Sequence, residues 1–71
     1  MHNMYKIAFS HERGEPIAAI DGYKTRTVFG AEERAYMEYE RVLCQLEPER
    51  IALFKRCNGE WVLLDRLTAV N

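Results

Sequence analysis

Apolar runs long enough to form a membrane helix are missing from this 71-residue chain. Such a helix needs about 18 or more consecutive apolar residues, and charged residues interrupt this sequence well before that length. Residues 1–6 also lack a basic region followed by an apolar core, so they do not resemble a secretory signal. We therefore expect a cytoplasmic protein that does not bind a membrane.

An excess of one charge is missing as well. The chain has 10 lysines and arginines against 11 aspartates and glutamates, with no polybasic tail and no long acidic block. Net charge of this kind does not by itself predict a nucleic-acid partner.

Metal-ligand residues are scarce, with His2, His11, Cys44 and Cys57 as the full set of histidines and cysteines. Their spacing matches no compact ligand pair such as C-x₂-C or H-x₃-H. We predict neither a metal site nor a cofactor. In a cytoplasmic chain both cysteines are expected to be reduced thiols.

Catalytic motifs are also missing. The sequence has no phosphate-binding glycine loop, no serine nucleophile elbow and no HExxH. No catalytic residue is predicted, and a non-enzymatic role is favoured. A small enzyme with a site at Cys57 or His11 is kept as the last alternative. Cys57 follows two cations, Lys55 and Arg56, which can lower the pKa of a thiol.

The strongest structural signal that is present is Asn58–Gly59, between the apolar runs 51–54 and 61–64. Both central positions of a type I′ turn need positive φ, and Asn-Gly meets this requirement best. The sequence therefore predicts a β-hairpin in the last third of the chain.

The first 29 residues are typical of strands. Residues 4–10 and 23–29 alternate between apolar and polar side chains, as half-buried strands do. A short apolar run at residues 17–20 ends at Asp21–Gly22, a second turn dipeptide. We predict three antiparallel strands here, of which the middle one is the shortest.

After Gly30 the apolar period changes to that of a helix. Gly30 is the expected N-cap, and the acidic pair after it suits the positive end of the helix dipole. Pro48 disfavours helical geometry at the residue before it, which places the end near Leu46. The apolar stripe comprises Ala35, Tyr39, Val42, Leu43 and Leu46.

These elements predict a single α+β domain over residues 1–71. The expected order is β-β-β-α-β-β, with an antiparallel sheet and one helix packed on one face. The alternative omits the strand at residues 17–20.

The predicted hairpin is apolar on both of its faces. A two-residue loop places Phe54 opposite Leu63 and Leu53 opposite Leu64. One face then carries Ala52, Phe54, Trp61 and Leu63, and the other carries Ile51, Leu53, Val62 and Leu64. Since one helix covers only one face of a sheet, the second must be covered by sheet curvature, by the N-terminal strands or by a second copy of the chain.

The leading functional hypothesis is a non-enzymatic protein-interaction module that forms a homodimer or binds another protein. Aromatic residues and methionine are enriched at interfaces, and they broaden the apolar surface of the predicted helix. The same residues could instead be boundary residues half covered by their neighbours. The expected interface comprises Tyr36, Met37, Trp61, Val62 and Leu64.

The second hypothesis is a single-stranded nucleic-acid-binding protein with a basic, aromatic sheet face. The alternative interpretation is that strand lysines and arginines are ordinary solvent-side residues, with Arg56 in a cross-strand cation–π pair with Trp61. The candidate residues are Lys6, Lys24, Arg26, Arg56 and Trp61.

Overall fold

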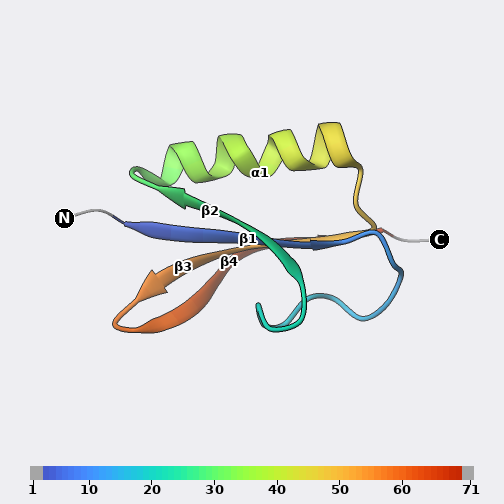
Figure 1. Ribbon diagram of the computed structural model, residues 1–71, viewed down its shortest axis with the longest axis horizontal. Helices are drawn as coiled ribbons and strands as arrows, with labels where there is room; N and C mark the ends of the chain where they lie inside the picture. The colour runs from blue at the N-terminus through green and yellow to red at the C-terminus, as the bar shows by residue number, and fades with distance from the viewer. Residues whose placement is uncertain (1–2, 70–71) are drawn as a thin grey trace.

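A computed structural model describes residues 3–69 as a four-stranded antiparallel sheet with one helix on one face (Figure 1). The sheet order is β2-β1-β3-β4, so β2 and β4 are the edge strands. The predicted α+β class is confirmed. The elements are β1 (Met4–Ser10), β2 (Lys24–Phe29), α1 (Glu32–Leu46), β3 (Arg50–Cys57) and β4 (Glu60–Thr68).

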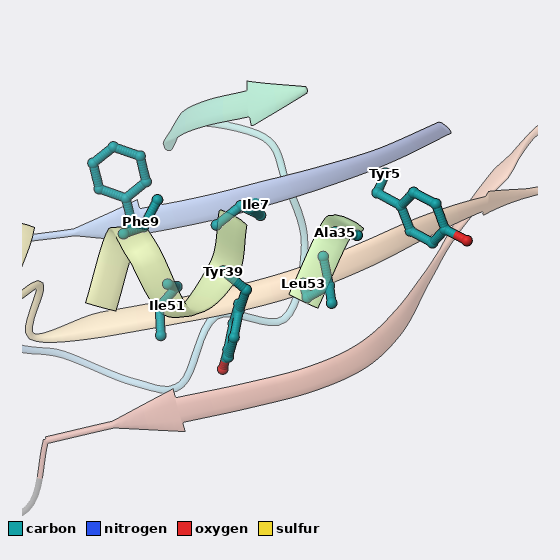
Figure 2. Packing of buried hydrophobic residues seen from close by; sticks show 8 residues of the cluster. Tyr5, Ile7, Phe9, Ala35, Tyr39, Ile51 and Leu53 are labelled. Carbon is teal, nitrogen blue, oxygen red and sulfur yellow. The ribbon is translucent and has the colours of Figure 1, made fainter. Parts of the chain in front are cut away.

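The main core lies between α1 and the two central strands (Figure 2). Ala35, Tyr39 and Val42 are buried on the helix, as the apolar stripe predicts. They pack on alternate residues of β1 and β3, because successive side chains of a strand point to opposite faces. The strand residues of this cluster are Tyr5, Ile7, Phe9, Ile51 and Leu53.

The helix ends where Pro48 requires, and it begins one residue later than expected. Glu47 adopts a left-handed conformation with φ 47°, and its N–H donates to the Leu43 carbonyl at 3.2 Å. The N-cap is Ala31, so the predicted N-cap at Gly30 was wrong. Gly30 instead makes the turn out of β2 with φ 116°, a conformation open mainly to glycine.

The hairpin turn is confirmed, with φ of 49° at Asn58 and 80° at Gly59. The predicted register is also confirmed from the turn as far as Phe54 opposite Leu63. Beyond that pair the register shifts, so Leu53 faces Asp65 and the predicted Leu53–Leu64 pair was wrong. The irregularity is a β-bulge, in which one extra residue of β4 stands opposite β3.

The strand predicted at residues 17–20 does not form, and the four-strand alternative is correct. Strand β1 has β2 on one edge and β3 on the other, and residues 17–20 do not pair with the open edge of β2 either. Ile17 is instead fully buried on the sheet face opposite the helix, against Ala8, Ala52 and Phe54. Residues 11–23, here called the covering loop, thus cover part of that face (Figure 1).

One arginine of β3 fastens the covering loop. Its Nε donates to the Glu12 carbonyl at 2.8 Å, and Nη1 donates to the Glu15 carbonyl at 3.0 Å. The same Arg50 side chain also donates to the Tyr23 hydroxyl and to Ser10 Oγ, each at 3.2 Å. From β4, Arg66 Nη1 donates to the Ile17 carbonyl at 3.3 Å. The loop is therefore held by its buried side chain and by two guanidinium groups.

Candidate interaction surface

Strand β4 is the part of the sheet that the helix leaves uncovered. The helix lies over β1, β2 and β3 and makes no comparable contact with β4. On the helix side of β4, Val62 is 44% exposed and Leu67 is 53% exposed. Apolar side chains on an edge strand are a hazard for pairing with other chains unless something covers them. We define the β4 patch as Tyr36, Val62, Leu64 and Leu67.

Tyr36 and Leu64 form the border between this patch and the core. Both are partly buried and pack against the main core cluster. Tyr36 makes an edge-to-face contact with Tyr39, with ring centroids 6.2 Å apart. Burial raises the pKa of Tyr36, and the carboxylates of Asp65 and Glu32 raise it further. Glu38 and Arg41 lie on the β2 side of the helix, and at about 3.6 residues per turn Tyr36 lies on the opposite flank of the buried stripe, which is the β4 side.

Tyr39 belongs to the main core cluster (Figure 2). Its hydroxyl is buried and has no hydrogen-bond partner among the described residues. Burial raises the pKa of Tyr39 well above its usual value of 10.0, and Asp65 and Tyr36 raise it further. Folded Tyr39 therefore keeps its proton at pH values at which the unfolded residue loses it. Above about pH 10 unfolding releases this proton, so rising pH favours the unfolded state.

We expect the free energy of unfolding to fall above pH 10 by at most about 1.4 kcal/mol per pH unit from this one group. Urea unfolding between pH 8 and pH 12 measures the slope. In Tyr39→Phe the slope should be shallower, while titrating lysines affect both proteins equally. Because the hydroxyl has no partner among residues 3–69, the replacement should cost little at neutral pH. Equal slopes for the two proteins would contradict the assignment.

The opposite face of β4 carries a different set of side chains. Leu63 is 38% exposed there, and Trp61 is partly buried against the smaller core cluster around Ile17. Lys6 Nζ lies 5.6 Å from the Trp61 ring centroid, and the Arg56 guanidinium lies 5.1 Å from it. The indole is thus already engaged by two cations, and the Arg56–Trp61 pair takes the cross-strand position predicted for it.

The five predicted interface residues do not lie on one surface. Tyr36, Val62 and Leu64 come together in the β4 patch. Trp61 points to the opposite face of the sheet, since successive residues of a strand alternate. Met37 is exposed on the β2 side of the helix, where it lines a groove with residues of that strand.

The predicted nucleic-acid residues divide in the same way. Lys6, Arg56 and Trp61 converge on the face opposite the helix. Lys24 and Arg26 pair with Phe9 and Ile7, so they lie on the helix side. Arg26 is also in an ion pair with Glu38 of the helix, at 3.6 Å. No single face therefore presents the five residues together.

The candidate enzyme residues lie apart. His11 follows β1 in the covering loop, beside the β3 end that begins at Arg50, whereas Cys57 ends β3 at the other end of the sheet. Cys44 is exposed on the helix. Among residues 3–69, no group of three or more metal-ligating side chains is close enough to hold an ion. His2 lies outside the described residues.

Comparison of the chain with protein-family models, with curated proteins and with solved structures finds no match in any of the three. Within residues 3–69, no helix has the length and apolar character that a membrane crossing needs.

Leu67 is the patch residue that the sequence did not predict. Strict alternation along β4 places Arg66, and not Leu67, on the face of Val62 and Leu64. The bulge after Leu63 changes this, because Leu67 pairs with Ile51 and so joins the helix side. Arg66 moves to the other face, where it reaches the covering loop.

Proposed function

We propose that the protein is a non-enzymatic interaction module that forms a homodimer through the β4 patch. The observation that carries this proposal is an edge strand with exposed Val62 and Leu67 beside the core and no element of residues 3–69 above them. A small domain buries little apolar surface for its length. A second chain that covers β4 would bury the apolar side chains that the fold of one chain leaves exposed.

A symmetric dimer requires a patch that can face itself across a two-fold axis. The β4 patch suits this, because it is apolar and carries charges of both signs at its border, Asp65 of β4 and Lys55, which pairs with Val62. A standard interface buries about 800 Å² on each partner, which is about one sixth of the 4991 Å² accessible surface of the chain. A contact of that size has to extend from the patch onto the neighbouring surface of α1.

The bulge in β4 favours packing of faces over pairing of edges. A bulge interrupts the backbone ladder and twists the edge, which is one way in which proteins prevent unwanted strand addition. Two β4 strands therefore cannot form one uninterrupted ladder over all nine residues. Side-chain packing of the helix-side faces does not require that ladder.

Sedimentation equilibrium at micromolar concentration tests the proposal. We expect twice the 8.4 kDa chain mass for the wild type. The double variant Val62→Glu, Leu67→Glu should sediment as 8.4 kDa, because in the dimer two charges then have to be buried unpaired. We expect the dissociation constant to rise at least about 100-fold, or about 2.7 kcal/mol.

Met37→Glu is the control, which adds one glutamate at an exposed apolar residue on the other side of the helix. It should leave the dimer intact. A wild type that sediments only as the single chain would end the proposal. Equal dissociation by Met37→Glu would show that the effect is one of general charge and not of the β4 patch.

A further inference from the structure

An open groove of about 720 Å³ runs between α1 and the edge strand β2, on the side of the molecule away from β4. Residues 26–29 form its strand wall. Its helix wall consists of Arg34, Met37, Glu38 and Arg41. Phe29, at 53% exposed, and Met37, at 67%, are the apolar side chains that it leaves open to solvent.

The groove carries a net positive charge, although the chain as a whole has a net negative charge. Three arginines line it against one carboxylate, so its net formal charge is +2. The whole chain has a net charge of −1, which leaves −3 for all other residues. Glu38 lies 3.6 Å from Arg26 and also 3.6 Å from Arg41, so one carboxylate serves two guanidinium groups. Arg34 forms no ion pair within residues 3–69.

The strand wall of this groove also offers unpaired backbone groups. β2 pairs with β1 on one side, and its other edge has no partner strand among the described residues. An extended peptide can add to such an edge through main-chain hydrogen bonds, with alternate side chains facing each side of the sheet. Alternate residues of an added strand would therefore face the helix side, where the arginines lie.

We propose that this groove binds an extended acidic peptide of another protein, which adds to β2 as a fifth strand. Carboxylates at every second position of the peptide contact Arg26, Arg34 and Arg41. Guanidinium groups suit carboxylates because they donate two parallel hydrogen bonds. The apolar residues between the carboxylates lie on the other side of the sheet, on the face of Phe29.

The occupant is not a strand of a second copy of this chain. None of β1, β2, β3 and β4 carries acidic residues at alternate positions. The groove also lies at the opposite edge of the sheet from the β4 patch, so this proposal is independent of the dimer.

The test uses the full chain and the fluorescein-labelled peptide (Val-Glu)₄ as the probe, with fluorescence anisotropy and ¹⁵N–¹H spectra as readouts. We expect saturable binding that weakens with salt, with shifted amide signals in β2 and the facing part of α1. The peptide (Val-Lys)₄ should not bind. A (Val-Glu)₄ peptide with N-methylated valines should bind at least about tenfold more weakly, because it cannot complete the ladder on β2.

Two protein variants complete the test. Arg34→Gln with Arg41→Gln should weaken binding about tenfold, since each exposed ion pair contributes up to about fivefold. The matched control, Arg13→Gln with Arg56→Gln, removes the same charge from exposed arginines outside the groove and should weaken it less than twofold. Any one of four results would overturn the proposal. These are an equal loss of affinity in the two double variants, equal affinity for the N-methylated and unmodified peptides, amide shifts confined to β4, and no binding of (Val-Glu)₄.

Discussion

Replacing Ile17 with alanine is expected to lower the free energy of unfolding by about 3 kcal/mol. The side chain is fully buried against Ala8, Ala52 and Phe54, on the sheet face that the helix does not reach. Truncation of a buried isoleucine to alanine costs about 2–5 kcal/mol, because transfer energy is lost and a cavity remains. The loss is large for a 71-residue chain, whose total stability is on the order of 5 kcal/mol.

Urea unfolding followed by circular dichroism measures this change. Ile17→Val is the conservative control, with an expected loss of about 1 kcal/mol. Ile20→Ala should also cost less than Ile17→Ala, because Ile20 is only partly buried. If Ile17→Ala changed stability by less than 1 kcal/mol, the covering loop would contribute little to the fold, and the sheet face beneath it would be open in solution.

Most of the fold could be predicted because its signals are local. Asn58–Gly59 fixes the hairpin turn through backbone geometry that few other residues tolerate. The helix end follows from Pro48, and the buried side of the helix follows from the spacing of Ala35, Tyr39 and Val42. Each of these signals depends on residues within a few positions of one another, so no knowledge of tertiary contacts is needed.

The covering loop could not be predicted in the same way. An apolar run of four residues can bury its side chains within a sheet as a strand, or against a face of the sheet as a loop. Ile17 takes the second course: β2, and not residues 17–20, pairs with β1, and Ile17 is buried against the sheet face that the helix does not cover. This is a fact of sheet order, and the sequence around residues 17–20 carries no trace of it.

The composition of the β4 patch was only partly predictable, for a related reason. Alternation from the hairpin turn correctly placed Val62 and Leu64 on one face with Ile51 and Leu53, and only the structure shows that the helix lies on this face. Leu67 was missed because the bulge after Leu63 shifts the alternation by one residue. No residue in this stretch is a recognised bulge signal, so the shift is set by pairing with β3 and the core.

The groove beside β2 was not predicted at all, although its arginines are plain in the sequence. Arg26 is far along the chain from Arg34 and Arg41, and these residues meet only because the helix packs along the β2 side of the sheet. Alternation does place Arg26 and Thr27 on opposite faces of the sheet, but only the pairing with β1 shows that Arg26 is on the helix side. The candidate surfaces thus depend on sheet order and helix placement.

Replacing Arg50 with methionine is expected to lower the free energy of unfolding by about 2–4 kcal/mol. The side chain donates four hydrogen bonds, three to the covering loop and one to Ser10 of β1. Its guanidinium also lies 5.4 Å from the Tyr23 ring centroid. Hydrogen bonds contribute about 1 kcal/mol each on balance, and the more exposed ones contribute less. Methionine keeps the apolar stem but removes every donor.

Equilibrium unfolding of three variants separates this role from that of charge. Arg50→Lys keeps the charge but lacks the planar fork that reaches several acceptors, so it should recover less than half of the loss. Arg13→Met removes an exposed arginine whose ion pair with Glu49 is at 4.0 Å, and it should change stability by less than about 0.5 kcal/mol. Full recovery by Arg50→Lys would mean that only charge at this position matters.

The double variant of Ile17→Ala and Arg50→Met tests whether one loop is responsible for both losses. Because the two losses together approach the total stability of the chain, all four proteins of this cycle are unfolded in the presence of a stabilising osmolyte such as trimethylamine N-oxide. If each side chain acts by holding the covering loop on the sheet, the second substitution finds the loop already released. The combined loss should then fall short of the sum by about 1–2 kcal/mol, within the range of coupling energies for residues that share a structure. Independent contributions would add within about 0.5 kcal/mol. A non-additive result would show that the covering loop protects the sheet face opposite the helix. The exposed side chains on the helix side of β4 would then be the apolar surface that is left for a second chain.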